Sequence, residues 1–413
     1  MRRQWRSSHF QEVSVKFGVF YNPMVPKAPG KDDWEPGQER KVLTDMIEQI
    51  RFADSLGFEY AFLGEHHFMP EYAHNSATEV ILGALSHSTT NIRIGTGIVH
   101  ASHNDPIRTA ERIATLDQIS GGRAEFGFGP GTTQEIAPWV KNDLPRKRER
   151  SDASAQVSID ILGTPGVWPG VDNEFFQFPP GNVVPKTYQT PHPPLWTSTA
   201  VPNMAPEVAA RGLGQLMLTL AGPEAVAAEV QAYWDTLRSG AVTPMGKGIN
   251  PAVFTFTMGL LARTDELAEE RAREGLEYYG FGLTGGAMAR IGDPNHHLWD
   301  SFQDFKAGRA DIRLESGLAQ FLIDIGYHFA DLPGTMMCGP EKAREFTRQI
   351  EATHADGLLL NQQFGWTKHE HLMESLEIWA KEVIPEFRER EQEHQAWRKQ
   401  QLDGIDFPVV SSL

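Results

Sequence analysis

Two adjacent histidines that directly follow a short apolar run are the first candidates for chemistry in this sequence. The residues that follow the run Tyr60 to Leu63 are, in order, Gly64, Glu65, His66, His67 and Phe68. An imidazole titrates near neutral pH, so it can give or take a proton during a reaction. The alternative is that both are ordinary loop histidines bound to a neighbouring carboxylate. Spacing alone leaves these two interpretations open.

Three further segments have the composition of ligand-binding loops. They are Gly97-Ile98-Val99, Gly129-Pro130-Gly131 and the hydroxyl pair Ser198-Thr199. A glycine within a strand often marks a bulge or the close approach of a ligand to the backbone. Hydroxyls and backbone N–H groups at a helix start suit a phosphate. Turn glycines and an ordinary helix cap explain the second and third segments equally well.

Alternating strands and helices must position these segments. Short apolar runs, each followed by an amphipathic helical stretch, predict a parallel sheet built from βα units. The expected strands are Val15–Tyr21, Tyr60–Leu63, Ile92–Val99, Ala124–Phe128, Leu195–Ser198, Leu216–Leu218, Ala252–Leu261 and Gly357–Asn361. Eight such units predict an α/β fold of the (β/α)₈ TIM-barrel type. Catalytic groups of such barrels lie at the carboxyl ends of the strands, where the candidate segments fall.

The rest of the chain predicts one domain with additions. Residues 1–14 are expected to be a disordered leader, 15–390 a single barrel domain, and 391–413 a charged tail that extends outward. Within the domain, 163–193 should form a small hairpin outside the barrel and 264–333 a mostly helical insertion. Both insertions are expected to roof the pocket, and the aromatic residues of the hairpin favour an apolar substrate. Those residues are Trp168, Phe175, Phe176 and Phe178.

Composition excludes several classes of function. The formal net charge of −16 argues against nucleic acid and against anionic lipid, since both need a basic surface. The single cysteine, Cys338, cannot form a disulfide framework or a cysteine-based metal site. No apolar run approaches the ~18 residues that a membrane span needs. We therefore expect a cytoplasmic protein without nucleic-acid or membrane partners.

Several stretches together resemble the bacterial luciferase-like flavin-dependent monooxygenases. The most specific is Leu116 to Arg123, which reads LDQISGGR and runs into Phe126 to Gly129. Further matching stretches are Lys16–Gly18, Phe62–Phe68, Ile92–Gly97, Ala355–Leu360 and Glu382–Pro385. The resemblance spans Lys16 to Phe387 and is weakest over 264–333.

The resemblance implies an enzyme that uses reduced FMN, supplied by a separate flavin reductase, and molecular oxygen. A C4a-peroxyflavin would then oxygenate a small, apolar organic substrate. His66 matches the catalytic histidine of the family, and His67 matches a second histidine in the same motif. The flavin ring is expected against Gly97-Ile98-Val99, where the family often has a bulge or a cis peptide. Glu65 and the Gly129-Pro130-Gly131 segment are also expected to line the cofactor site. A homodimer that forms through the second and third helices is expected as well.

One position departs from the luciferase pattern. The large subunit of luciferase carries an arginine for the flavin phosphate where this chain has Pro130. A phosphate still needs a cationic or hydrogen-bonding partner. The candidates are Arg150, from the basic run 146–150, together with Ser198 and Thr199. A solvated helix start is the alternative explanation of the basic run.

Three other functions compete with this interpretation. A deazaflavin (F420)-dependent oxidoreductase shares the fold and transfers hydride, but the tandem His66-His67 after Glu65 looks more like the oxygenases. A metal-dependent hydrolase could use His66, His67, His100 and His103, yet the first strand lacks a His-x-His pair, so we expect no metal. A flavin-storing barrel like the small luciferase subunit is disfavoured because His66 is retained.

Overall fold

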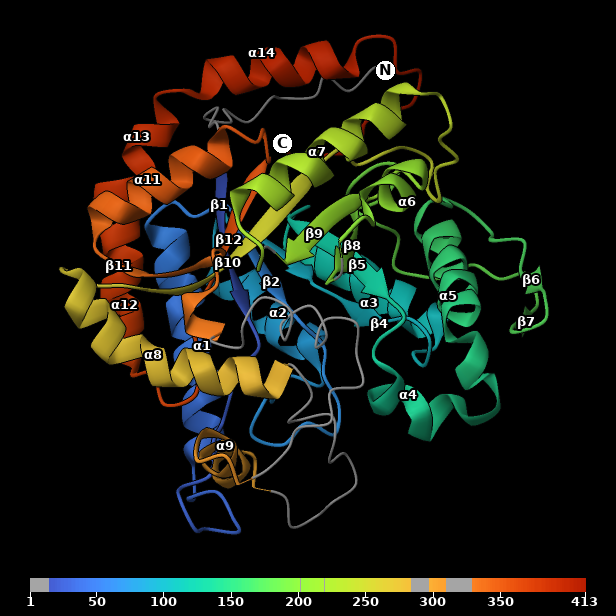
Figure 1. Ribbon diagram of the computed structural model, residues 1–413. Helices are drawn as coiled ribbons and strands as arrows, with labels where there is room; N and C mark the ends of the chain where they lie inside the picture. The colour runs from blue at the N-terminus through green and yellow to red at the C-terminus, as the bar shows by residue number, and fades with distance from the viewer. Residues whose placement is uncertain (1–14, 201, 219, 284–296, 310–328) are drawn as a thin grey trace.

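Eight parallel strands close into a barrel surrounded by helices, which confirms the predicted TIM-barrel fold. The computed structural model describes residues 15–200, 202–218, 220–283, 297–309 and 329–413, so the expected leader lies outside the described residues (Figure 1). The barrel strands are β1 Lys16–Tyr21, β2 Tyr60–Leu63, β3 Arg93–Thr96, β5 Ala124–Gly129, β8 Leu195–Thr199, β9 Gly214–Leu218, β10 Val253–Leu261 and β12 Gly357–Asn361. Each pairs in parallel with the next, and β12 pairs with β1 to close the ring.

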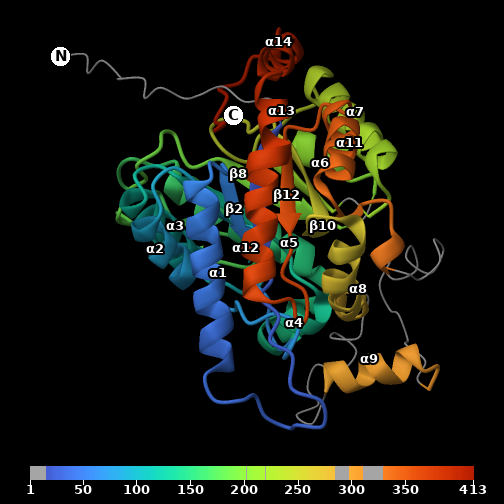
Figure 2. The same ribbon diagram turned by 90° about the vertical axis from the view of Figure 1, so that its left-hand side faces the viewer.

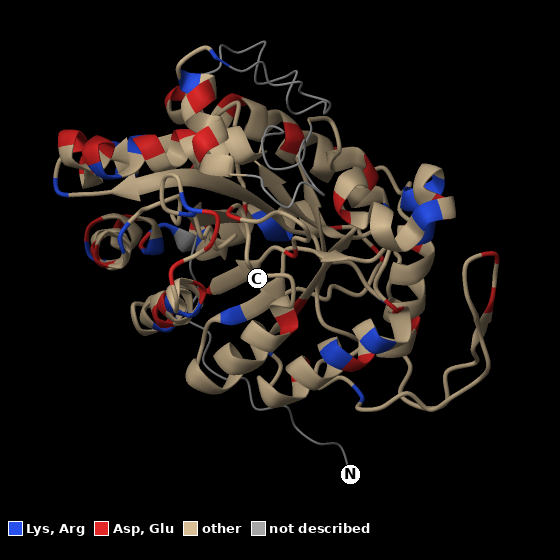
Figure 3. Ribbon diagram, turned by 90° about the horizontal axis from the view of Figure 1, so that it is seen from below, with Lys and Arg blue, Asp and Glu red and all other residues tan. Residues whose placement is uncertain are grey.

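The strands form where the sequence has nearly continuous apolar runs, as expected for strands buried on both faces. All nine residues of β10 and all five of β12 are buried. Charged residues lie mostly on the outer helices, while the strands are mostly tan in Figure 3. Among the described residues, no helix is both long and apolar enough to span a membrane.

The helices of the outer layer begin and end at recognisable signals. They are α1 Gln38–Ser55, α2 Thr78–Ser88, α3 Pro106–Ile119, α4 Thr133–Val140, α5 Lys147–Leu162, α6 Ala205–Ala210, α7 Pro223–Arg238, α8 Asp265–Phe281, α9 Leu298–Lys306, α11 Pro340–Glu351, α12 His369–Ile378, α13 Ile384–Arg388 and α14 Glu391–Leu402. Helix α3 has Pro106 in its first turn, and the Asp105 side chain accepts a hydrogen bond from the Arg108 N–H. Aspartate is a favoured residue at this capping position, and proline in the first turn costs no hydrogen bond.

The predicted third strand is interrupted at its glycines. β3 ends at Thr96, and the chain resumes as β4 Val99–His100, which pairs with β5 instead of continuing between β2 and β5. The peptide between Gly97 and Ile98 is cis, as the family resemblance led us to expect. A short strand that was not predicted, β11 Thr335–Cys338, extends the sheet beside β10.

The chain's last residues close the amino-terminal end of the barrel, so the prediction of an outward tail is wrong. Helix α14 lies across that end in Figure 2, and α9 lies at the opposite end. Beyond α14, the Ser412 hydroxyl lies 2.7 Å from the Tyr60 hydroxyl and 2.7 Å from the Glu125 carboxylate. Leu413 packs against the aromatic layer inside the barrel. That layer consists of Phe20, Tyr60, Phe62, Trp196, Leu216, Ala252, Phe254, Phe256 and Leu359.

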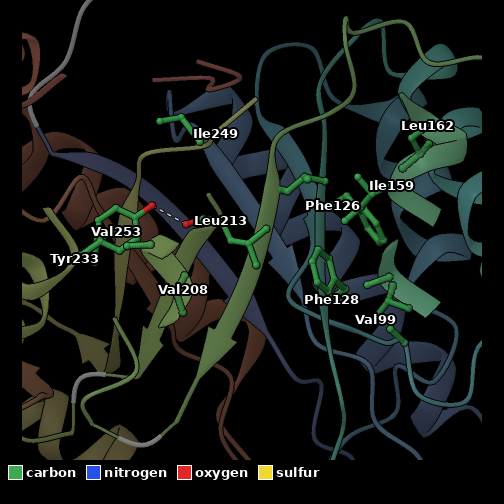
Figure 4. Close-up of a cluster of buried hydrophobic side chains, with 14 of the residues drawn as sticks. Val99, Phe126, Phe128, Ile159, Leu162, Val208, Leu213, Tyr233, Ile249 and Val253 are labelled. Atoms are coloured by element: carbon green, nitrogen blue, oxygen red, sulfur yellow. Dashed lines mark hydrogen bonds between the residues drawn. The ribbon is translucent and has the colours of Figure 1, made fainter. Parts of the chain in front are cut away.

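The hydrophobic cluster between the barrel and the helices around α5 contains the aromatic residues of the predicted hairpin. In Figure 4, Phe126 and Phe128 of β5 lie beside Ile159 and Leu162 of α5. The small hairpin forms from β6 Val171–Asp172 and β7 Gln177–Phe178 at the edge of the molecule. Its aromatic residues pack into this cluster or against it, and the roofing of the pocket by the hairpin stays a prediction. The insertion 264–333 is helical in α8 and α9, and 284–296 and 310–328 lie outside the described residues.

Candidate functional site

The loop that follows β2 carries His66 at the carboxyl end of the barrel, where a buried carboxylate holds its ring. Nδ1 of His66 lies 2.9 Å from Oε1 of Glu135, in the first turn of α4. Glu135 has no exposed surface. It also accepts hydrogen bonds from the His67 backbone N–H at 3.0 Å and from the Thr132 hydroxyl at 2.7 Å. The loop after β2 and the start of α4 are therefore joined through one carboxylate.

The charge of Glu135 fixes which nitrogen of His66 carries a proton. Burial tends to raise the pKa of Glu135, but the positive charge and the hydrogen bond of His66 outweigh burial and bring the pKa to about 2. An ionised carboxylate can only accept hydrogen bonds, so Nδ1 of His66 must carry hydrogen. In the neutral ring, Nε2 then has a free lone pair. Among the described residues, no hydrogen bond to Nε2 is observed, and the side chain is 18% exposed.

A second carboxylate, Glu65, organises the other face of the same loop. Nε2 of His67 lies 2.7 Å from Oε1 of Glu65, and the amide of Asn104 donates to the same oxygen at 2.9 Å. The backbone N–H of His100 donates to Oε2 at 3.1 Å. Burial raises the pKa of Glu65, but the hydrogen bond from His67 and the nearby imidazoles of His100 and His103 bring it to about 2. Glu65 is therefore also ionised at neutral pH.

Three buried polar groups near the carboxyl ends of the strands gather around the hydroxyl of Tyr279. They are Oδ1 of Asn22, just after β1, the hydroxyl of Tyr72, after β2, and Oδ1 of Asn361, at the end of β12. The ring of Tyr72 also lies 5.7 Å from that of His66. Buried polar groups are nearly always hydrogen-bonded in native proteins, so unpaired ones call for water, an ion or a ligand. Tyr279 satisfies part of this group, and its remaining hydrogen-bonding capacity is suited to a water or a polar ligand.

The glycine segments bring neighbouring strands very close together. A Cβ atom at Gly127 would lie 2.1 Å from the carbonyl oxygen of Thr96, and one at Gly129 would lie 2.6 Å from Cδ1 of Ile98. Gly131 has φ +69, and a Cβ there would lie 2.9 Å from the His100 ring. These glycines therefore have a packing role beside the cis peptide, and their role toward a cofactor stays a prediction.

The predicted phosphate ligands lie near the ends of β5 and β8. Ser198 is exposed, and the hydroxyl of Thr199 accepts a hydrogen bond from Gln215 at 2.9 Å. Nε of Arg150 donates to the Ser102 carbonyl at 2.9 Å, and Nη1 contacts Asp143 at 3.0 Å. Arg150 is thus already bound to protein groups.

Lys147 comes nearer to the predicted phosphate loop than Arg150 does. Its Nζ lies 3.0 Å from the carbonyl oxygen of Gly131. Arg150 contacts the same segment indirectly, because the hydroxyl of Ser102 donates to the Pro130 carbonyl at 2.7 Å. Lys147 belongs to the same basic run in the sequence as Arg150. The run was considered for the phosphate site, but only Arg150 was named as a candidate ligand.

Sequence reasoning also missed three residues that hold the histidines. They are Glu135, Asn104 and Trp139, whose indole stacks on His103 with ring centroids 4.4 Å apart. A signal for Glu135 was available. Thr132 and Glu135 form a Thr-x-x-Glu pattern typical of a helix start, and the Thr132 side chain does cap α4.

Comparison with known proteins gives a consistent result. The sequence profile of the family described as luciferase-like monooxygenase matches residues 15–316. The chain is 24% identical over 386 residues to 4-hydroxyprotoasukamycin monooxygenase from Streptomyces nodosus subsp. asukaensis, covering 90% of this chain and 92% of that relative. For three other curated relatives, the match spans 45%, 48% and 59% of their length.

Two solved structures show that the fold is shared across different cofactors. One is the oxygenating constituent of 3,6-diketocamphane monooxygenase from Pseudomonas putida, a type II Baeyer–Villiger monooxygenase in complex with FMN. It superposes with a TM-score of 0.62 at 18% identity, over 91% of this chain and 99% of that one. The other is an F420-dependent secondary alcohol dehydrogenase with a TM-score of 0.62 at 14% identity, over 90% of this chain and 98% of that one. At these identities, the likeness concerns the fold.

Proposed function

Because the chain belongs to the luciferase-like monooxygenase family, we propose that it is a two-component flavin-dependent monooxygenase that uses reduced FMN and O₂. Its substrate would be a small, apolar organic molecule. The relative that it matches over most of its length is named a monooxygenase. A structural neighbour of the same fold is an oxygenating constituent in complex with FMN, which supports a separate reductase as partner.

The observation that carries this proposal is the hydrogen bond between Nδ1 of His66 and the buried carboxylate of Glu135. Bound reduced FMN would supply the activation of O₂. Glu135 orients the ring through Nδ1, so that Nε2 can accept a proton from a reacting group. The imidazolium that forms would be stabilised by the same carboxylate at 2.9 Å, and Nε2 could then return the proton. His66 would be the acid–base residue and Glu135 a positioning residue.

The remaining residues of the site would bind and orient the cofactor. The backbone of Gly97, Ile98 and Val99 and the segment from Gly129 to Pro130 and Gly131 would lie against it. Ser198, Thr199 and Arg150 would bind its phosphate, and we add Lys147 because it contacts Gly131. Glu65 and His67 would hold the loop around His66, since the His67 backbone donates to Glu135.

The alternative function is an F420-dependent oxidoreductase, whose fold this chain equally matches. Anaerobic binding of reduced FMN and reduced F420 to the purified protein distinguishes the two. We expect tighter binding of reduced FMN. On mixing with oxygenated buffer, hydrogen peroxide should be released more slowly than from free reduced FMN, because the site shields the cofactor from water. Tighter binding of reduced F420, with hydride transfer from it under strict anaerobiosis, would contradict the proposal.

A homodimer through α2 and α3 remains part of the proposal. Val80 on α2 is 74% exposed and Ile119 on α3 is 56% exposed, although both are large apolar residues. Burying such side chains against a second copy would be favourable. Sedimentation that shows only a species of 46.1 kDa would contradict it.

A further inference from the structure

Four potential metal ligands converge beside the His66–Glu135 pair. They are Glu65, His67, His100 and His103. Each can contribute one ligand atom, and these atoms all lie within 4.8 Å of one another. The residues come from two loops, after β2 and after β4. The sequence indicated His67, His100 and His103 as possible metal ligands, but it did not indicate Glu65.

One of the printed distances matches the spacing in a small tetrahedral site, and a second is shorter. Zinc binds imidazole nitrogen and carboxylate oxygen at about 2.0–2.2 Å, so neighbouring ligand atoms in a tetrahedral site are about 3.4 Å apart. Nε2 of His103 lies 3.4 Å from Oε1 of Glu65. Nε2 of His67 lies 2.7 Å from the same oxygen and would need to move away by roughly 0.7 Å to reach that spacing.

The group also contains unused binding capacity. The side chain of His100 is almost completely buried, at 3% exposure, yet its Nδ1 has no hydrogen-bond partner among the described residues. A buried polar group in this condition calls for a water or an ion.

Surrounding groups hold the ligands in place before any ion arrives. Asn104 donates to Glu65 at 2.9 Å, and Arg112 donates to the carbonyl oxygen of the Asn104 side chain at 3.0 Å. The indole of Trp139 stacks on His103 and packs against His67 at 4.9 Å. Partners outside the ligand shell that orient the ligands in this way are typical of metal sites.

We propose that Glu65, His67, His100 and His103 bind one Zn²⁺ ion next to the flavin site. The donor set of three imidazoles and one carboxylate is of the nitrogen-and-oxygen class that zinc prefers. Bound zinc would take Nε2 of His67 away from Glu65 and would stiffen the loop that carries His66. Zinc binding at this site does not depend on the proposed function, because the four side chains bind the ion without flavin or substrate.

Zinc binding is measured on the full-length protein after removal of metal by a chelator, in competition with a chromophoric chelator and without flavin. We expect one Zn²⁺ per chain. His103→Asn should weaken binding by at least about 100-fold, since even the loss of an outer partner costs 10–100-fold. The matched control is His87→Asn, because His87 is an exposed histidine on α2, and this variant should bind zinc normally.

Two results would overturn the proposal. One is the absence of stoichiometric binding to the unaltered chain, and the other is equal affinity in His103→Asn and His87→Asn. If His103→Asn does not fold, the visible absorption of Co²⁺ added to the unaltered chain tests the site instead. Intense visible absorption typical of four-coordinate cobalt supports the site, and the weak absorption of octahedral cobalt overturns it.

Discussion

Replacing His66 should cost stability as well as chemistry, because its ring satisfies a fully buried charge. From its place in a loop after a strand, the expected loss for His66→Ala would be about 0.5 kcal/mol or less. In the structure, however, His66 provides one of three hydrogen bonds to Glu135, which has no exposed surface. A hydrogen bond to a charged group contributes about 1.5–3 kcal/mol. We therefore expect His66→Ala to lower the free energy of unfolding by about 2 kcal/mol.

A second variant at the same position separates structure from chemistry. The Nδ2 amide of asparagine can take the place of Nδ1 as a donor to Glu135, but asparagine has no group in the place of Nε2. His66→Asn should therefore stay within about 1 kcal/mol of the unaltered protein. Both variants should lose the proton transfer, which contributes roughly 10²-fold or more to turnover.

The assay combines urea denaturation without cofactor and peroxide release from bound reduced FMN after mixing with oxygen. Both variants should release hydrogen peroxide faster than the unaltered protein, although only His66→Ala should be clearly less stable. If His66→Asn is as unstable as His66→Ala, the hydrogen bond to Glu135 is not the source of the stability. If His66→Asn releases peroxide as slowly as the unaltered protein, Nε2 has no role in the chemistry.

Three further predictions concern stability. The folded pKa of Glu135, about 2, lies below its ordinary value of 4.5, so its contribution to stability is present above pH 4.5 and is lost as the pH falls toward 2. The urea midpoint should therefore decrease as the pH is lowered from 4.5 toward 2, and it should decrease less steeply in Glu135→Gln. Equal slopes for the two proteins would contradict this. Deletion of 409–413 should lower the free energy of unfolding by about 3 kcal/mol or more, through lost hydrogen bonds to buried groups and lost apolar packing. An unchanged urea midpoint would show that this segment does not stabilise the end of the barrel. Gly127→Ala should destabilise by about 1–3 kcal/mol because its Cβ would lie 2.1 Å from the Thr96 carbonyl, while the control Gly83→Ala, with open space around the Cβ, should stabilise α2 by up to about 1 kcal/mol.

The barrel could be predicted from the sequence because its signals are local. A strand such as Gly357–Asn361 is recognisable as an apolar run between helical stretches, and this does not require knowledge of the strands with which it pairs. A strand forms in each of the eight predicted segments, although the third, Ile92–Val99, is interrupted after Thr96. Strand Thr335–Cys338 was missed because it is short and follows an insertion without a clear period.

Residues that contact one another across loops could not be predicted in the same way. His66 was identified from its motif, but its partner Glu135 lies 69 positions further along the chain, in the first turn of α4 after the loop that follows β5. Nothing in the spacing indicates that these loops meet. Their meeting depends on the adjacent strands being held at fixed separation and register in the closed sheet.

The sequence by itself determined the alternation of strands and helices, the family and the segment that carries His66. Only the tertiary structure decided that Glu135 holds that ring, that three imidazoles surround Glu65, and that Leu413 returns to close the barrel. The physical reason is that periodicity and turn composition record the environment of each element separately. Contacts between loops and termini arise only when the ring of strands closes and brings distant segments to the same end of the barrel.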